Sequence, residues 1–221
     1  MTTLVEKHFL HRGHGLEFEM EVAWIRRQLP RGEGPMVDLG CGIGALVDIL
    51  GRDRAIGIDC NAIGLRHTAA RLPGAKLLCA SVERLPFPDR SLEAITAQHL
   101  IEHLSDGETA CCEWFRVLRP GGSLLLLTPN AAFIDPSTFA DATHARIFRS
   151  DELGDLVRGA GFDIIDLRTI GVPFFRDYKN TPGFWRARRF VTHHAHSLSA
   201  IPGLGQRGQT LCCAARRPID S

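Results

Sequence analysis

The sequence predicts an α/β fold in which a mostly parallel sheet carries helices on both faces. Two observations lead to this prediction. Short apolar runs of strand length alternate along the chain with segments in which apolar residues recur at helical spacing. Such alternation is typical of parallel strands that are joined by crossover helices. The length of 221 residues suits one domain of this kind with one sizeable core.

Individual segments follow from the same patterns. The apolar runs predict strands at 36–39, 54–58, 76–80, 92–98, 123–128, 163–170 and 210–216. Helices are expected at 17–29, 46–50, 61–72, about 109–118 and 150–160. Ser150 is the expected N-cap of the last of these helices, and a hard turn is expected at Pro120-Gly121-Gly122.

The chain divides into an N-terminal helical flap at 1–30 and a main domain at 31–221. Within the main domain, residues 171–209 form a long segment between the last two strands, where aromatic residues alternate with arginines. Loops of this length usually carry function or structure of their own. We expect a small cap or lid that contacts substrate. The alternative interpretation is a subunit interface, which would make the protein a homodimer.

Composition limits the function classes. The formal net charge of +1 gives no general attraction for nucleic acid or an acidic membrane. Apolar runs such as 124–127 are far too short to span a membrane, and residues 1–15 lack an apolar signal core. The seven cysteines contain no CxxC pair and make no disulfide scaffold at this length. We therefore expect a cytoplasmic protein whose partner is a small molecule.

The sharpest local signal is the segment 37–44, VDLGCGIG, in which an apolar strand runs into three glycines and then a helix. Such glycines permit a tight turn and a close approach of the backbone to a ligand. Asp59 ends the next strand, where an acid can bind a ribose diol. The alternatives are a simple strand-to-helix turn and a helix N-cap at Asp59. The spacing differs from the G-x-G-x-x-G of dinucleotide sites, which disfavours a nicotinamide dehydrogenase.

Five segments extend this signal, and they occur in the order DLGCGIGAL, GIDC, SVERLPFPDRSLEAI, HLIEHL and RVLRPGGSLLLLTPN. Together they resemble the class I S-adenosylmethionine-dependent methyltransferases, in the broad family that contains many small-molecule and sugar methyltransferases. The resemblance covers residues 36 to about 162. It implies a Rossmann-like, doubly wound sheet of seven strands with an antiparallel last strand, and S-adenosyl-L-methionine as the cofactor.

The resemblance also implies a set of cofactor-binding residues, namely Asp38, Gly40, Cys41, Gly42, Gly44, Asp59, Cys60, Ser81, Val82 and Gln98. Asp38, the glycines and Gln98 would surround the methionine part. Asp59 would accept hydrogen bonds from both ribose hydroxyls, and Cys60, Ser81 and Val82 would lie beside the adenine. Many family members have Asp in place of Ser81. A serine hydroxyl also accepts hydrogen bonds, so we expect binding to survive this difference.

Two histidines are the predicted acid/base residues. A sulfonium methyl group is already activated, so alignment supplies most of the catalysis, and a base helps when the acceptor must lose a proton. His99 follows the fourth strand and His144 follows the fifth. If both face one crevice, they are the candidates for this role. The predicted reaction is methyl transfer to oxygen, ahead of nitrogen, of a small molecule such as a sugar or natural-product intermediate.

A metal site is the sharpest alternative. His99, Glu102 and His103 have i, i+3, i+4 spacing, which would place them on one helical face, and His144 could complete a ligand set. Small-RNA 2′-O-methyltransferases and ubiquinone-pathway O-methyltransferases have a similar Glu-x-x-Glu-His arrangement that binds a metal, but His99 replaces their first Glu. The simpler interpretation is a loop that Glu102 and His103 fix without a metal.

Two further alternatives remain. A second histidine trio, His8, His11 and His14, has no acidic or cysteine partner nearby, which favours solvated side chains over zinc ligands. We therefore expect no resident metal, and a metal-assisted RNA 2′-O-methyltransferase stands as the alternative function. A non-catalytic module that binds the cofactor is the other alternative.

Overall fold

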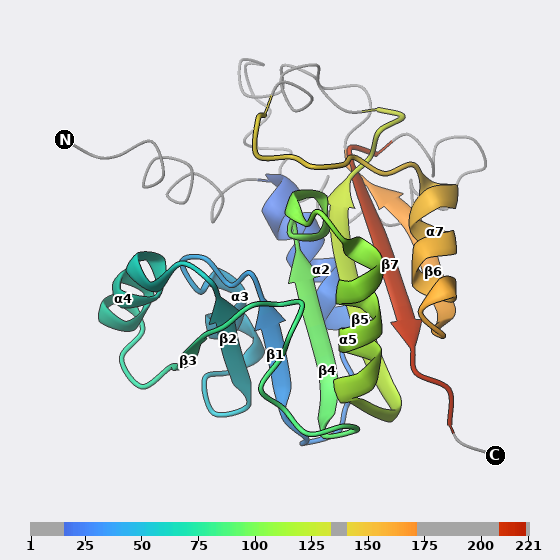
Figure 1. Cartoon of the computed structure of the whole chain (residues 1–221). Coiled ribbons are helices and arrows are strands. Elements are labelled where there is room, and N and C mark those ends of the chain that lie inside the picture. The colour runs from blue at the N-terminus through green and yellow to red at the C-terminus, as the bar shows by residue number, and fades with distance from the viewer. Residues whose placement is uncertain (1–15, 134–140, 172–207, 220–221) are drawn as a thin grey trace.

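The computed structural model describes residues 16–133, 141–171 and 208–219, which carry colour in Figure 1. Its centre is a seven-stranded sheet with the order β3-β2-β1-β4-β5-β7-β6. The strands are β1 Met36–Leu39, β2 Ala55–Asp59, β3 Lys76–Cys79, β4 Leu92–Gln98, β5 Leu118–Pro129, β6 Asp163–Ile170 and β7 Thr210–Arg216. β1 to β5 pair in parallel, whereas β7 runs antiparallel to both β5 and β6. The predicted fold class is confirmed, including the antiparallel last strand.

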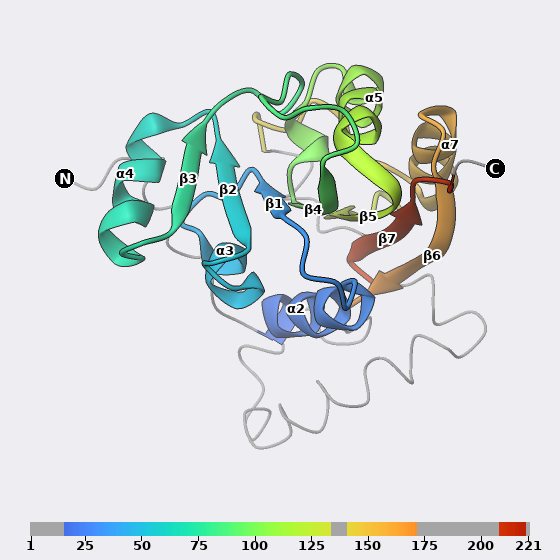
Figure 2. The ribbon, with the colours of Figure 1, turned by 90° about the horizontal axis from the view of Figure 1, so that it is seen from below.

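Helices cover both faces of the sheet. They are α2 Leu16–Gln28, α3 Ala45–Leu50, α4 Ala62–Arg71, α5 Gly107–Val117 and α7 Ser150–Gly159, with a short 3₁₀ turn η1 at Ile101–His103. Figure 2 shows α2 and α3 on one face and α5 and α7 on the other. β5 serves both layers, because Leu125 packs with α2 whereas Leu124 packs with α5. The run of leucines in β5 is therefore buried on both sides, as parallel sheets with helices on both faces require.

Three local expectations differ from the structure in their bounds. The strand expected at 123–128 is part of β5, which begins at Leu118. The turn predicted at 120–122 lies at a register shift, since Leu118 pairs with Leu92 whereas Ser123 pairs with Ala94, and Gly121 has a left-handed φ of 74°. Arg149, not Ser150, is the N-cap of α7, and the Glu152 side chain accepts a hydrogen bond from the Arg149 backbone N–H. The helix expected to begin near residue 109 begins at Gly107, after Asp106 caps it.

The described part of the predicted flap is α2, and it packs into the core. Trp24 and Ile25 are fully buried against the sheet. The indole Nε1 of Trp24 donates to Oδ2 of Asp166 in β6 at 3.1 Å. Residues 1–15, with His8, His11 and His14, lie outside the described residues, as does most of the predicted lid at 171–209. Within the described ranges, no helix has the length and apolar character needed to cross a membrane.

Candidate cofactor and catalytic site

The predicted site residues gather at one edge of the sheet. Because β1 to β5 are parallel, their carboxyl ends meet at the upper edge in Figure 1. The residues at 141–149 pass over this edge. The backbone N–H groups of Ala145 and Arg146 both donate to the carbonyl of Glu102, at 2.7 and 3.1 Å. In open α/β sheets this edge is where ligands bind.

The turn after β1 has the backbone conformation that its glycines predict. Gly40, Gly42 and Gly44 have φ angles of 65°, 51° and 71°, which lie in the left-handed region that other residues rarely adopt. Space is also restricted, since a Cβ on Gly44 would lie 2.5 Å from Cγ2 of Thr68. The turn therefore needs glycine for its conformation and, at Gly44, for the approach of α4.

Asp59 closes the glycine turn. Its Oδ2 accepts from the Gly42 N–H at 3.0 Å, and its Oδ1 accepts from the Asn61 N–H at 2.8 Å. The carboxyl is 9% exposed. Asn61 is the N-cap of α4, where its side chain accepts from the N–H groups of Ile63 and Gly64, so the alternative that Asp59 caps this helix is wrong. Each Asp59 oxygen keeps a lone pair with which it can accept a further hydrogen bond.

Asp38 lies in the core below the glycine turn. It is 3% exposed and accepts a hydrogen bond from Oγ1 of Thr96 at 2.8 Å. Burial raises the pKa of Asp38 to about 7, against the opposing effect of the Thr96 hydrogen bond and with a contribution from the charge of Asp59. A cation bound near this edge would favour the ionised carboxylate.

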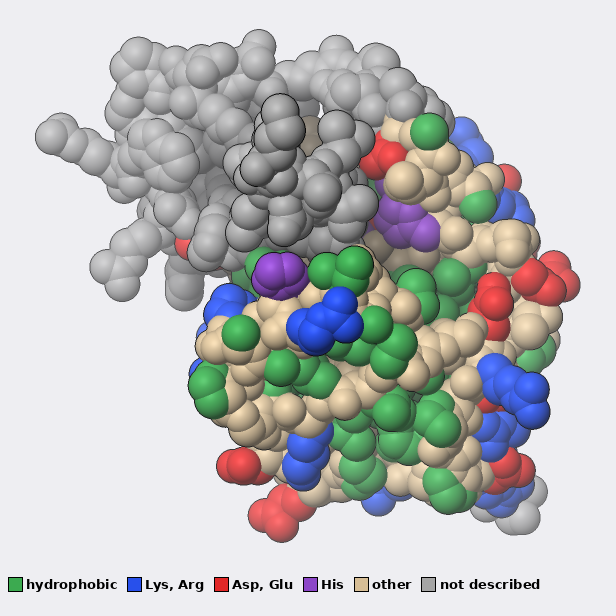
Figure 3. All heavy atoms as spheres, turned by 60° about the vertical axis from the view of Figure 1, so that its left-hand side comes forward, with side chains coloured by type: hydrophobic (Ala, Val, Ile, Leu, Met, Phe, Trp, Pro, Cys, Tyr) green, Lys and Arg blue, Asp and Glu red, His purple; other side chains and the backbone are tan. Residues whose placement is uncertain are grey.

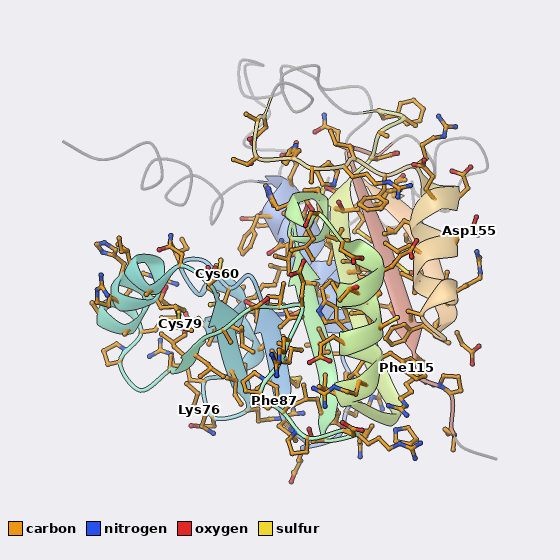
Figure 4. All side chains as sticks on the ribbon, viewed as in Figure 1. Cys60, Lys76, Cys79, Phe87, Phe115 and Asp155 are labelled. Atoms are coloured by element: carbon orange, nitrogen blue, oxygen red, sulfur yellow. The ribbon has the colours of Figure 1, made fainter. Side chains whose placement is uncertain are left out.

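The remaining predicted adenosine residues differ in exposure. Cys60 is exposed, and Figure 4 labels it beside the end of β2. Ser81 is exposed too, and its hydroxyl accepts from the Glu83 N–H at 3.2 Å. Cys41 and Val82 are buried, and burial raises the pKa of the Cys41 thiol. The Val82 carbonyl accepts from Nε1 of Trp114 at 2.9 Å. Of these four side chains, a ligand can therefore reach those of Cys60 and Ser81 directly.

His99 is fixed between two buried carboxylates. Its Nε2 lies 3.1 Å from Oε1 of Glu21, and its Nδ1 lies 3.5 Å from Oε1 of Glu102. Burial alone would lower the pKa of His99, but the two carboxylates outweigh this effect and raise it to about 10. A general base must have a free lone pair to accept a proton. This arrangement keeps His99 protonated near neutral pH, so it does not favour the expected role as a base.

Glu21 is a site residue that sequence reasoning missed. This carboxylate comes from α2 and is 4% exposed. Its Oε2 accepts from Nε2 of Gln98 at 2.6 Å, and its Oε1 accepts from Oγ1 of Thr210 at 2.8 Å. The signal in the sequence is its helical spacing, since Glu21 lies three and four residues before Trp24 and Ile25 and shares their buried face.

The four residues of the predicted metal set lie near one another, but not on a helical face. His99 has a left-handed φ of 51° and precedes the single turn of η1. Ligand atoms of Glu102, His103 and His144 lie within 4.8 Å of one another. His103 Nδ1 is 3.0 Å from the Thr143 carbonyl, which leaves its Nε2 directed at Oε1 of Glu102, 4.0 Å away. The structure therefore groups Glu102, His103 and His144, whereas His99 lies between Glu102 and Glu21.

Comparisons with known proteins show which domain family and which proteins this chain is similar to. Residues 37–126 match the methyltransferase domain family. A Mycolicibacterium smegmatis protein named as a probable S-adenosylmethionine-dependent methyltransferase is 33% identical over 173 residues, which cover 76% of this chain and 64% of that protein. The chain thus spans less than two thirds of the length of this relative.

Solved structures give the same fold. An S-adenosylmethionine-dependent methyltransferase of Thermotoga maritima has a TM-score of 0.69 and 24% identity, with 96% of this chain and 93% of that chain covered. The [4+2]-cyclase SpnF has a TM-score of 0.66 and 21% identity, with 92% and 82% covered. The fold therefore accommodates more than one chemistry. Residues 37–126 thus match the methyltransferase domain family, and the chain is similar over about three quarters of its length to a protein named as a probable S-adenosylmethionine-dependent methyltransferase.

Proposed function

We propose that this chain binds S-adenosyl-L-methionine at the carboxyl edge of its sheet and transfers the methyl group to a hydroxyl oxygen of a small molecule. The observation that carries the proposal is the hydrogen bond from Gly42 N–H to Asp59 Oδ2, 3.0 Å long. This hydrogen bond joins the glycine turn to Asp59. The backbone of the turn, which a ligand can approach closely, therefore lies beside a carboxylate that can accept hydrogen bonds from the two ribose hydroxyls.

The residues at this edge suit the parts of the cofactor. Asp59 has lone pairs for the ribose hydroxyls, and the exposed Cys60 and Ser81 follow β2 and β3, where the adenine would lie. Asp38 and Gln98 stand on the methionine side, at β1 and at the end of β4. When bound, the cofactor supplies an activated sulfonium methyl group. These residues bind and orient it, which is the larger part of catalysis for such a donor.

His144 is the side chain that we assign to removal of the acceptor proton. It lies on the segment that passes over the carboxyl edge, and its ring centroid is 4.9 Å from that of His103. An imidazole is a suitable acceptor for the proton that a hydroxyl must lose as it is methylated. The preference for oxygen over nitrogen rests on this histidine and on the family resemblance.

The test is methyl transfer from isotope-labelled S-adenosyl-L-methionine to panels of sugars, phenols, amines and RNA. We expect label in a small hydroxylated acceptor, and a loss of at least tenfold in turnover for His144→Gln with little change in cofactor affinity. The matched control is His67→Gln, an exposed histidine on α4. Absence of cofactor binding would refute the proposal, and label confined to amines would refute its oxygen acceptor.

The grouping of Glu102, His103 and His144 favours a second candidate, a metal-assisted RNA 2′-O-methyltransferase. The Thr143 carbonyl fixes the His103 ring in the way that metal-binding histidines are usually oriented. The surface favours a small-molecule acceptor over RNA. On the face that Figure 3 shows, acidic and basic side chains are mixed among the described residues, whereas RNA binding calls for a continuous basic surface. Calorimetric titration with Zn²⁺ and Mn²⁺ distinguishes the two, since only a metal site gives one-to-one binding that His103→Ala abolishes.

A further inference from the structure

The helix α2 places a buried carboxylate against the end of β4. Glu21 is 4% exposed, yet both of its oxygens are hydrogen bonded to side chains of other elements. Gln98 and His99 come from the carboxyl end of β4, and Thr210 comes from the start of β7. A carboxylate in a core is costly unless it is paired and hydrogen bonded, so an apolar residue would serve packing alone equally well.

The residue that Glu21 holds has a strained backbone. His99 and Arg90 are the non-glycine residues with positive φ among those that the structure describes, and His99 is the one at the proposed cofactor edge. Its N–H donates to the Leu127 carbonyl at 2.8 Å, while its ring contacts Glu21 on one side and Glu102 on the other. Strained residues persist where surrounding contacts fix them, and such residues cluster at functional sites.

We propose that Glu21 is a positioning residue of the methyl-transfer site, which acts through Gln98 and His99 although it belongs to the N-terminal helix. Its Oε2 fixes the Gln98 side chain, and its Oε1 fixes the ring of His99 at 3.1 Å. The inference rests on the proposed function, because Gln98 is assigned there to the methionine side of the cofactor. If Glu21 has this role, α2 belongs to the same site as the glycine turn and Asp59.

The test is a double-mutant cycle on the affinity for S-adenosyl-L-methionine, measured by calorimetry on the full chain. Glu21→Gln and Gln98→Ala are each expected to raise Kd at least tenfold. If Glu21 acts through Gln98, the double variant binds no more weakly than the weaker of the two single variants. Glu19→Gln, an exposed residue of the same helix, is the matched control and should stay within twofold of the parent protein.

Two outcomes would overturn the inference. The first is a Glu21→Gln variant whose Kd for S-adenosyl-L-methionine lies within twofold of that of the parent protein. The second is full additivity of the binding free-energy changes of Glu21→Gln and Gln98→Ala, because additive changes mean that the two residues act independently. Should Glu21→Gln fail to fold, Glu21→Asp keeps the charge with a shorter reach and takes its place in the cycle.

An NMR readout separates this inference from the proposed function. The Nε2 proton of His99, hydrogen bonded to Glu21, should give a slowly exchanging downfield resonance in the parent protein that Glu21→Gln weakens or removes. This signal needs neither cofactor nor acceptor. A parent protein that shows the signal but binds no cofactor contradicts the proposed function and leaves the contact of Glu21 with His99 standing, whereas absence of the signal contradicts this contact itself.

Discussion

The buried Asp38 carboxyl makes the free energy of unfolding depend on pH. Burial raises the pKa of Asp38 to about 7 from its ordinary value of 3.8, so between these pH values the folded protein holds a proton that the unfolded chain has released. The stability that this proton adds is present below pH 4 and is lost as the pH rises through 7. Each pKa unit is worth about 1.4 kcal/mol, so the loss is on the order of a few kcal/mol.

The measurement is the free energy of unfolding in urea from pH 4 to pH 8, compared between the parent protein and Asp38→Asn. The uncharged variant should lack this component, so that the parent protein loses stability relative to the variant as the pH rises. Taking the difference removes the contribution of carboxylates such as Glu21 and Glu102, whose pKa values are lowered and which act with the opposite sign. A constant difference across this range would show that Asp38 ionises normally.

Asp59 is the residue whose loss should weaken the cofactor site most directly. In Asp59→Asn the charge is removed, and hydrogen bonds to a charged acceptor contribute about 1.5–3 kcal/mol each. We expect the Kd for S-adenosyl-L-methionine to rise at least tenfold in equilibrium dialysis, while Asp53→Asn, an exposed control, leaves it unchanged. Because Asp59 also fixes the Gly42 N–H, the variant should lose some thermal stability as well. Equal affinity in both variants would contradict the ribose assignment.

Local motifs predicted the glycine turn and Asp59, but not Glu21 or the state of His99. The first two belong to one strand–helix–strand unit, β1–α3–β2, so that a short stretch of chain specifies their geometry. Glu21 is bonded to partners 77, 78 and 189 residues away, and only the packing of α2 brings them together. Without Glu21, His99 resembles an ordinary histidine with a pKa near neutrality, which is why the sequence suggested a base.

At the scale of elements, the N-cap of α4, which packs beside the glycine turn, makes a contribution to stability that can be measured on its own. Asn61 accepts from the N–H groups of Ile63 and Gly64, both at 3.1 Å. Asn61→Ala should lower the free energy of unfolding by about 1 kcal/mol, because two N–H groups lose their acceptor. Asn61→Asp keeps an acceptor and should restore most of this loss in the same urea titration. If both variants match the parent protein, the cap contributes nothing to stability.

The elements also show where periodicity fails as a guide. Apolar periodicity places the start of the fifth strand at residue 123, but Leu118 already pairs with Leu92, before the register shift that contains the Pro-Gly-Gly segment. His99, Glu102 and His103 have helical spacing, yet only η1 forms there, and the three meet because Glu102 is buried between the two rings. In both cases tertiary contacts, which spacing along the chain does not contain, decide the local structure.

For the whole molecule, the sheet joins two separate packing layers. Trp24 of α2 lies in the layer on one face, and Trp114 of α5 lies in the layer on the other. Both are almost fully buried, at 1% and 0% exposure. The leucines of β5 alternate between the two layers. If either layer unfolds, the leucines that face it become exposed to water, and this destabilises the strand on which the other layer also packs.

This architecture predicts that α2 unfolds together with the sheet. Single-tryptophan variants, Trp114→Phe/Trp185→Phe and Trp24→Phe/Trp185→Phe, allow each layer to be followed by fluorescence while circular dichroism follows the helices. Within each variant, the two signals should change at the same urea concentration, because one cooperative unit unfolds. A detachable N-terminal flap would instead give a Trp24 transition at lower urea than the loss of helix signal. That result would also remove Glu21 from the site, because the contacts of Glu21 to β4 and β7 require α2 to be docked.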